Sequence, residues 1–448
     1  MNLAEQIFNA GIVGCGGAGF PTHIKFQKQA EYLLINGAEC EPLLYTDRYV
    51  MRECATQVVS AAAALCAEIQ AQSCLIVLKE HYQKEIAALQ AAITETQAKV
   101  GLCLLESFYP SGDEHTLVYE ATGRLVPPGG LPLDVGCVVT NAATALAVYD
   151  AMGGQPFTHK YLTVSGAVTR PVIVRAPIGT SLLECLELAG GASINDYCAL
   201  LGGPMMGQVI GTAELKRGVV TKTLSGMIIL EADNRLRQFQ ELSQRQMSIR
   251  ARAACIRCSQ CSDLCPRYLL GHPLQPHRVM RQLALSKDVA ALPLDDPAIQ
   301  SAALCCECGV CELVACPMGL QPRRINAALK KRLAQTGFRY PKGAGQSEAH
   351  SWRDMRKLPT ARAAARAGIY RYQDIVINEL AEATPRQVCL PLSQHSGAPS
   401  EALVGNGERV SAGQLIARCP EGKLGANLHA SISGEIKLAD EAMIISAI

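Results

Sequence analysis

The first third of the chain alternates short apolar runs with Ala-rich segments of helical spacing. A short buried strand is predicted at 75–78, between helices expected at 57–70 and 84–97. This alternation is typical of a sheet covered by helices. We therefore expect an α/β domain over residues 1–150.

Two later stretches have the pattern of small β domains. Residues 151–232 are predicted to hold short strands and one helix, at 161–164, 172–174, 182–189 and 200–203. Residues 385–448 alternate short strands with Gly turns, as small β sandwiches do. Between these two domains, the polar segment 231–252 is helical in composition and leads into a cysteine-rich region at 245–335. The pattern predicts a multidomain chain.

A basic stretch interrupts an otherwise nearly neutral chain. Residues 321–372 contain 13 Lys or Arg against Glu348 and Asp354, whereas the whole chain has a net charge of +2. Charge runs usually form solvated faces, so we interpret residues 336–384 as a basic linker. The alternatives are docking of an acidic partner and compensation of negatively charged clusters.

Composition narrows the class of protein. The 448 residues are 49% hydrophobic and 18% charged, which is typical of a globular chain, and 5% aromatic residues argue against base-stacking surfaces for nucleic acid. No apolar run reaches the ~18 residues of a membrane span. No secretory signal is visible at the start, so a cytoplasmic, reducing compartment is expected and the 20 cysteines are not expected to form disulfides.

Two cysteine motifs give the strongest chemical signal. Four cysteines spaced C-x2-C-x2-C-x3-C-P form the run that holds a 4Fe-4S cluster, and a second run has four residues before its last Cys. The motifs comprise Cys255, Cys258, Cys261 and Cys265, and then Cys305, Cys308, Cys311 and Cys316. In two-cluster ferredoxins the fourth ligand comes from the other motif. We therefore predict two clusters, with Cys316 completing the first and Cys265 the second.

Zinc is the alternative occupant of these motifs. It prefers two separated C-x2-C pairs, and neither motif is arranged that way. Cys306 is a further candidate ligand in place of Cys305, but it would leave the spacing Cys306-x-Cys308, which the turn does not favour. We interpret Cys306 as a neighbour of the cluster.

A glycine-rich loop near the N-terminus is a weaker signal. Gly14, Gly16 and Gly19 satisfy G-x-G-x-x-G, and Glu39 lies twenty residues further on. The apolar positions before the loop are spaced like a helix face, whereas the dinucleotide fingerprint needs a strand there. The loop amides, with Lys25 nearby, suit a phosphate, and a turn without a ligand is the alternative.

Three segments extend this signal into a resemblance. The runs GCGGAGFPTHIKF, EYLLINGAECEP and YPSGDE, which begin at Gly14, Glu31 and Tyr109, resemble the FMN site of the flavin subunit of respiratory complex I and, more closely, the C subunit of the Rnf electron-transport complex. The resemblance implies an FMN domain whose flavin is surrounded by Gly14, Gly16, Gly17, Gly19, Lys25, Asn36, Tyr109, Gly112, Asp113, Thr140 and Asn141. It also implies that NADH stacks on the flavin beside Phe20, Glu39, Glu41 and Glu114.

The order of domains resembles the corrin reductases of bacterial propanediol-utilisation microcompartments. That resemblance implies a Rossmann-like FMN domain, an SLBB-like β-grasp domain, a helical ferredoxin domain with two 4Fe-4S clusters, and a C-terminal barrel-sandwich domain. Ser431 and Ser433 occupy the hairpin tip where a lipoyl carrier has Lys, so no swinging arm is expected.

The same resemblance implies an activity. NADH would reduce FMN, and the clusters would relay single electrons to cob(III)alamin or cob(II)alamin for a corrinoid adenosyltransferase. It implies a location in the microcompartment lumen, among shell or cargo proteins. An Rnf-type NADH:ferredoxin subunit and a non-catalytic electron-transfer adaptor are the alternatives.

Overall fold

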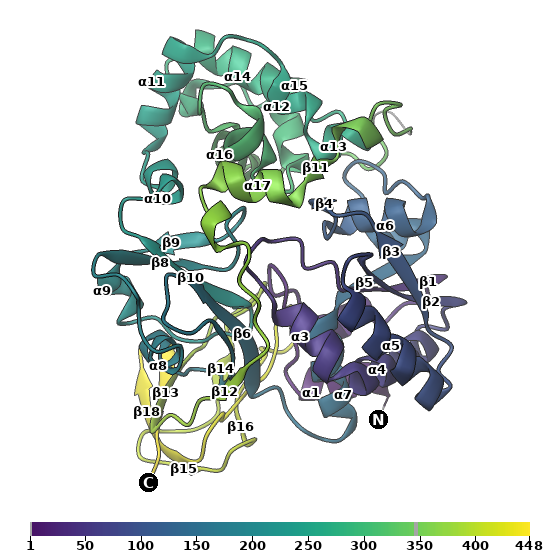
Figure 1. The fold of residues 1–448 in the computed structure, drawn as a ribbon, viewed down its shortest axis with the longest axis vertical. Coiled ribbons are helices and arrows are strands. Elements are labelled where there is room, and N and C mark those ends of the chain that lie inside the picture. Colours follow the sequence, from purple (N-terminus) through teal and green to yellow (C-terminus); the bar gives the residue numbers. More distant parts are fainter. Residues whose placement is uncertain (1, 345–347) are drawn as a thin grey trace.

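The computed structural model describes residues 2–344 and 348–448, which form four regions (Figure 1). The N-terminal region is built on a parallel four-stranded sheet of order β3-β2-β1-β5. Its strands are β1 (Tyr32–Asn36), β2 (Ser73–Lys79), β3 (Gly101–Leu105) and β5 (Cys137–Asn141). The alternation of apolar runs and Ala-rich helices therefore produces the α/β domain that it predicts.

Helices cover both faces of this sheet. They are α1 (Leu3–Asn9), α2 (Thr22–Lys25), α3 (Thr46–Glu53), α4 (Ala55–Glu68), α5 (Gln83–Thr96), α6 (Glu114–Thr122) and α7 (Ala142–Met152). A capping box at Asn2 and Glu5 begins α1, so a helix and not a strand precedes the glycine loop, as the apolar spacing indicates. The predicted strand at 75–78 and both predicted helices are present.

The second region is a six-stranded sheet of order β12-β7-β6-β10-β8-β9. Its elements are β6 (His159–Gly166), β7 (Val172–Pro177), α8 (Leu182–Leu188), β8 (Tyr197–Leu201), β9 (Gln208–Ile210), α9 (Thr212–Leu215) and β10 (Gly226–Glu231). The strand expected at 200–203 ends earlier because Gly202 turns the chain with a positive φ of 84°. The sixth strand, β12 (Leu380–Glu382), comes from much later in the chain and pairs with β7.

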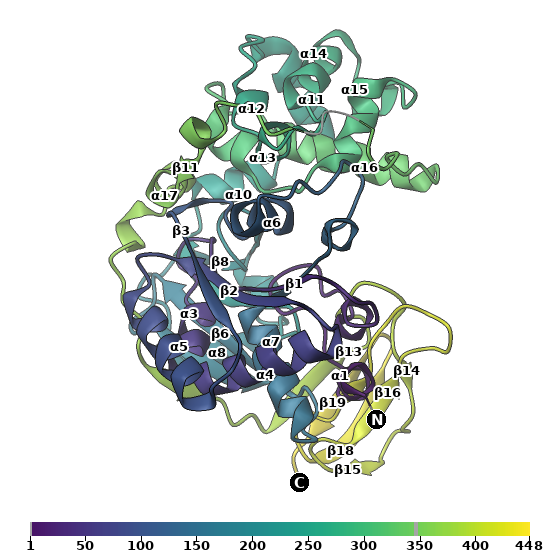
Figure 2. The same ribbon diagram turned by 90° about the vertical axis from the view of Figure 1, so that its right-hand side faces the viewer.

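The third region is helical and carries both cysteine motifs. The helix expected over 231–252 is two helices, because the first ends at Gln240 and Ser243 begins a second one by accepting from the Gln246 amide. The helices are α10 (Arg235–Gln240), α11 (Gln244–Ala254), α12 (Gln260–Asp263), α13 (Pro266–Leu269), α14 (Pro276–Leu285), α15 (Pro297–Gln300) and α16 (Pro322–Gln335), with a π-helical turn at Val310–Ala315. Figure 2 shows this region stacked above the α/β domain.

The segment 336–384, expected as a basic linker, is integrated with the other regions. It contains β11 (Leu358–Pro359), which pairs with β4 (Phe108–Tyr109), then α17 (Thr360–Ala367) and β12. Two of its cations pair with the α/β domain, Lys342 with Asp134 and Arg353 with Glu120, and Arg371 pairs with Glu231 of the second region. Part of the basic stretch is therefore paired within the chain.

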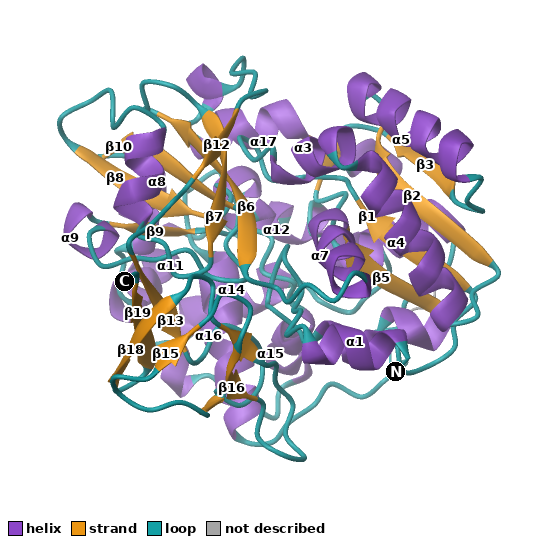
Figure 3. Cartoon of the chain, turned by 90° about the horizontal axis from the view of Figure 1, so that it is seen from below, coloured by secondary structure: helices purple, strands orange, loops and turns teal. Residues whose placement is uncertain are grey.

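The C-terminal region consists of two small antiparallel sheets, seen from below in Figure 3. Their strands are β13 (Gln387–Pro391), β14 (Glu401–Ala402), β15 (Arg409–Val410), β16 (Leu415–Arg418), β17 (Leu428–His429), β18 (Gly434–Ala439) and β19 (Ala442–Ser446). The apolar core of this region is continuous with that of the α/β domain.

One buried cluster joins the first three regions. It includes Leu44 and Tyr109 of the α/β domain, Met205 of the second region, and Val310 of the cysteine-rich region. Burial of these side chains fixes the regions against one another. Among the described residues, no helix combines the length and the hydropathy that crossing a membrane requires.

Candidate functional site

The parallel sheet places the candidate flavin site at a topological switch point. β1 lies between β2 and β5, and Asn36 and Asn141 are register partners at the carboxyl ends of β1 and β5. In open α/β sheets, ligands bind beyond the strand ends where the winding reverses. The topology thus selects this edge without reference to any motif.

The glycine loop lies at this edge with unused amides. Gly14 donates to the carbonyl of Phe20 at 2.9 Å, which closes the loop, and the Cys15 amide donates to Thr144 Oγ1 at 3.0 Å. Within the described ranges, the amides of residues 16–19 donate to no other residue. A run of free backbone N–H groups is a ready site for phosphate oxygens.

The space around the loop fits such a ligand. A Cβ on Gly16 would lie 3.0 Å from the Asn141 side-chain nitrogen, whereas a Cβ on Gly17 would meet nothing within 4 Å. Gly16 therefore permits close approach of the loop to α7, and Gly17 faces open space. On the far side, Ser396 donates to the carbonyls of Ala18 and Gly19, so the C-terminal region supports the loop.

Cationic side chains approach the loop from two domains. Lys25 pairs with Glu114 at 2.6 Å and donates to the Val139 carbonyl at 2.9 Å. From the second region, the buried Lys160 donates to the Cys15 carbonyl at 3.3 Å. Lys160 therefore places a cation at the loop, whereas the charge of Lys25 is paired with Glu114 in this structure.

A third lysine, Lys222, joins three regions below the loop. It donates to the carbonyls of Gly11 at 2.7 Å and Asn427 at 2.6 Å. Burial lowers the pKa of Lys222 to about 7. The junction therefore contains a lysine whose charge changes near neutral pH.

Acidic groups occupy the other side of the site. Glu39 accepts from the amides of Asp47 and Arg48, so it caps α3. Burial, followed by repulsion from Asp47, raises the pKa of Glu39. Asp47 in turn accepts from Asn141 Nδ2 at 2.7 Å, and burial raises its pKa as well. Asp47 thus links Glu39 to Asn141 by hydrogen bonds. It was not among the site residues predicted from the sequence.

The remaining predicted flavin contacts frame the strand ends. Asn36 Nδ2 donates to the Gly112 carbonyl at 2.9 Å, and a Cβ on Gly112 would approach Cys40 Sγ to 3.1 Å. Thr140 is buried one residue before the end of β5, and Phe20 is half-buried beside the loop.

Glu41 and Tyr109 connect this site to the second cysteine motif. The Tyr109 hydroxyl donates to the Cys308 carbonyl at 2.8 Å and to Glu41 at 3.3 Å. Glu41 also accepts from the Met205 amide at 2.8 Å. Burial raises the pKa of Glu41 to about 7, although these hydrogen bonds and Arg323 oppose the rise. The loop at 204–207 is therefore a packed contact between three regions.

A buried ion pair makes a second connection. Asp113 caps α6 through the Thr116 amide, and its other oxygen binds Arg267 Nη2 at 2.9 Å. Arg267 lies two residues after Cys265. Burial opposes ionisation of Asp113, but Arg267 and then His115 hold its pKa below the usual value. The two connections from the flavin site thus lead to the backbone of Cys308 and to the segment that follows Cys265, two cysteines that line the same pocket.

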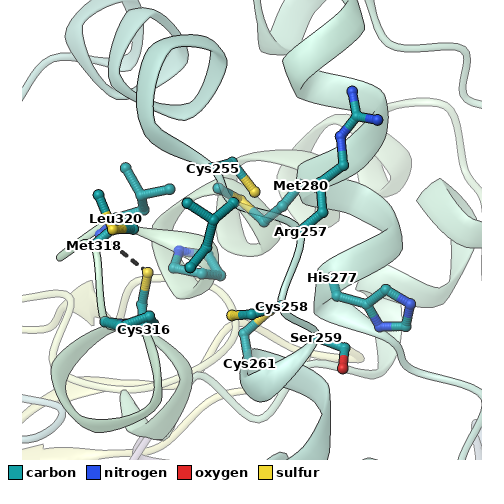
Figure 4. Close-up of a pocket in the computed structure, with 13 residues that line it drawn as sticks. Cys255, Arg257, Cys258, Ser259, Cys261, His277, Met280, Cys316, Met318 and Leu320 are labelled. Carbon is teal, nitrogen blue, oxygen red and sulfur yellow. Dashed lines mark hydrogen bonds between the residues drawn. The ribbon is translucent and has the colours of Figure 1, made fainter.

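The thiols of Cys255, Cys258, Cys261 and Cys316 line one cavity (Figure 4). Cys258 is exposed and Cys255 half-buried. Cys316 Sγ accepts from the Leu320 amide at 3.4 Å. The cavity combines three cysteines of the first motif with the last cysteine of the second, which is the crosswise grouping that the spacing predicts.

Cys265, Cys305, Cys308 and Cys311 line a second cavity, and all four are buried. Cys306 lines it too, which is compatible with its interpretation as a neighbour of the four thiols. In the described part of the chain, no three His, Cys, Asp or Glu side chains converge on a position for a single metal ion. The donor chemistry of each cavity, four cysteines around a shared space, fits an iron–sulfur cluster.

Several residues of the site have no sequence signal. Arg267, Lys160, Met205 and Ser396 come from outside the recognised segments, and only the packing of separate domains brings them to the site. Of these four residues, Arg267 has a weak sequence signal: it directly follows Cys265-Pro266, which could have suggested a role near the cluster.

Comparison with known proteins agrees with this organisation. Residues 7–150 match the family model of the Nuo51 FMN-binding domain, 161–209 the SLBB domain, 254–321 the 4Fe-4S dicluster domain, and 374–447 the RnfC barrel sandwich hybrid domain. The fold class predicted from the sequence is thereby confirmed.

Curated relatives match over nearly the whole chain. The chain is 41% identical over 444 residues to "Cobalamin reductase PduS" of Salmonella typhimurium strain LT2, and 39% identical to the protein of the same name from Citrobacter freundii. Each alignment covers 99% of this chain and 95% of the relative.

Solved structures show a related fold. Crystal structures of an NAD+-reducing NiFe hydrogenase, in its H2-reduced and air-oxidised states, match with a TM-score of 0.50 and 20% and 21% identity. The alignments cover 76% of this chain and 67% of the hydrogenase chain.

Proposed function

The chain belongs to the cobalamin reductase family represented by the Salmonella and Citrobacter proteins, and from this premise we propose that it is an NADH-dependent reductase of a cobalt corrinoid. FMN and two 4Fe-4S clusters are its proposed cofactors. Bound FMN would supply hydride chemistry with NADH, and bound clusters would supply single-electron transfer.

The observation that carries the proposal is the pair of contacts between the flavin site and the second cavity. Tyr109 bridges to the Cys308 backbone and Asp113 binds Arg267. These contacts hold the two sites at a fixed separation in a buried junction. We assign the second cavity, with Cys265, as the cluster site nearer the flavin, and the first cavity, with Cys316, as the farther one.

The chain's own residues have defined roles in this proposal. The free amides of 16–19 and the cations around them hold the flavin phosphate, and Gly17 leaves room for it. Asn36 and Asn141 lie at the strand ends beside the ring site. Glu41 is a buried carboxyl with a pKa of about 7, so it is able to hold or release a proton near neutral pH.

The family premise supports further steps of the proposal. We expect the reduced corrin to pass to a corrinoid adenosyltransferase, with the enzyme among shell or cargo proteins in the lumen of a propanediol-utilisation microcompartment. Electron transfer within the chain requires neither the adenosyltransferase nor the microcompartment.

The experiment is anaerobic NADH oxidation by the reconstituted protein, with cob(III)alamin, ferredoxin and a quinone offered in parallel. We expect cobalamin to be reduced and NADPH to be a poorer donor than NADH. Faster reduction of ferredoxin than of cobalamin would favour the Rnf-type alternative. A protein that retains iron but shows no flavin absorbance would be an electron-transfer adaptor and would contradict the proposal.

A further inference from the structure

The two cysteine cavities differ in their access to solvent. Cys265, Cys305, Cys308 and Cys311 are buried, whereas Cys258 of the first cavity is exposed. The contacts with the flavin site all involve the neighbourhood of the buried set. The first cavity is therefore the one placed for exchange with another molecule.

Apolar side chains surround the exposed thiol. Ile256 is 61% exposed and Met318 is 41% exposed, and both line the first cavity from opposite motifs. Pro317 is exposed beside Met318. Exposed apolar groups at the mouth of a site are typical of a protein–protein contact.

Arginines flank this apolar centre. His277 and Met280 of α14 line the cavity, and burial followed by the nearby exposed residues Arg281 and Arg278 lowers the pKa of His277. Arg281 donates weakly to the Arg257 carbonyl at 3.5 Å.

No carboxylate in the described ranges forms an ion pair with Arg257, Arg278 or Arg281. Asp263 is an acidic side chain near His277, and its carboxylate accepts a hydrogen bond from the Ser259 hydroxyl. The rim therefore has three arginines without an ion-pair partner among the described residues, beside the one nearby carboxylate of Asp263.

We propose that this surface docks an acidic one-electron carrier protein. The surface, which we call the exit face, comprises Ile256, Arg257, Cys258, Met318, Arg278 and Arg281. The positive rim attracts and orients an acidic partner, and the apolar centre excludes water from the contact. One electron leaves the cluster held by the first cavity and one enters the carrier, and no bond is made or broken.

This inference rests on the proposed cluster assignment but not on NADH or cobalamin. Since no natural carrier is identified, the probe is oxidised rubredoxin, an acidic one-electron protein, with basic cytochrome c as its counterpart. Binding of each labelled probe to the cluster-loaded full chain is measured by fluorescence anisotropy at low and high salt. Reduction of each probe by dithionite-reduced protein, after removal of excess dithionite, gives a second readout.

The test variant is Arg278→Glu/Arg281→Glu, which reverses two charges outside the cysteine motifs. Its control is Lys216→Glu/Arg217→Glu, an equal reversal at exposed residues by α9, in a different region of the molecule (Figure 1). Iron content and the electron paramagnetic resonance (EPR) signals of both preparations report whether the clusters are retained.

We expect rubredoxin to bind the wild type more tightly than cytochrome c does, with affinity that falls as salt rises. The test variant should bind rubredoxin at least about 10-fold more weakly at low salt, while the control variant stays near wild type. Equal affinity of the two variants, or preference for cytochrome c, would overturn the proposal.

Other occupants of the exit face give different results. Binding of anionic phosphatidylglycerol vesicles in place of rubredoxin would assign the face to a lipid surface. A dimer that the test variant alone loses in sedimentation would assign it to a second copy of the chain. Either result would overturn the proposal. Failure of NADH to reduce the protein would contradict the proposed function but leave these binding results intact.

Discussion

The ion pair between Asp113 and Arg267 gives the sharpest test of how the flavin domain is held against the cysteine-rich region. Both side chains are largely buried, with exposed fractions of 12% and 10%, and their atoms are 2.9 Å apart. Asp113→Asn removes the negative charge and keeps a side-chain oxygen for the Thr116 amide. Arg267 is then left as a buried cation without its carboxylate.

The expected loss follows from that burial. Removing one partner of a buried ion pair costs about 3–5 kcal/mol when the remaining charge is uncompensated, and the nearby Cys306 and Cys265 offset part of that cost for Arg267. The retained cap of α6 saves a contribution of about 1 kcal/mol, so we expect a loss near the lower end of this range. Asp354→Asn is the matched control. Asp354 also pairs with an arginine, Arg353, but its side chain is 79% exposed, and exposed pairs contribute about 1 kcal/mol or less.

The assay compares urea unfolding of wild type and both variants, followed by loss of cluster absorbance under anaerobic conditions. Asp113→Asn should lower the midpoint clearly, and Asp354→Asn should leave it almost unchanged. The double variant Asp113→Asn/Arg267→Met should recover part of the loss, because no unpaired charge remains. Equal midpoints for the two single variants would refute the reasoning.

Three further predictions concern the cofactor sites and the junction. Gly17→Asp places its new side chain in open space, and repulsion of the phosphate should lower FMN affinity at least about 100-fold while iron content stays normal. The control Gly405→Asp, whose side chain also meets open space, should retain flavin. Cys316→Ala should remove the EPR signal of the first motif's cluster and leave the signal of the second cluster unchanged. Cys306→Ala should leave both signals unchanged. Loss of the second cluster alone in Cys316→Ala would refute crosswise ligation. Burial lowers the pKa of Lys222 to about 7, so between pH 7 and the usual lysine pKa the unfolded chain binds more protons than the folded one. The free energy of unfolding should therefore rise with pH across that window, by up to about 1.4 kcal/mol per pH unit. Thermal unfolding of Lys222→Met should lack this pH dependence.

The elements with strong local signals could be predicted from the sequence. Helix α4 and strand β2 follow from apolar spacing alone, and the helix before the glycine loop follows from the positions of Leu3 and Ile7. The grouping of Cys316 with the first motif follows from the chemistry of paired clusters. These features depend on local spacing or on a repeated ligand pattern.

Contacts that depend on domain packing could not be predicted. Arg267 meets Asp113, and β12 pairs with β7, only because the regions assemble in one arrangement. The basic stretch illustrates the limit well. Its cations look like a solvated face in the sequence, yet Arg353 lies buried against Glu120 of the α/β domain. No local pattern marks which charges will find partners from another domain.

The central claim is that electrons enter at the flavin site and leave through the cluster of the first cavity. It is tested most directly by single-turnover reduction of cob(III)alamin in wild type and in Cys258→Ala, which lacks the exposed ligand of that cluster. NADH should bleach the flavin at the same rate in both proteins, and cob(II)alamin should form only in the wild type. Cobalamin reduction at the wild-type rate in Cys258→Ala, with the first cluster absent by EPR, would contradict the account.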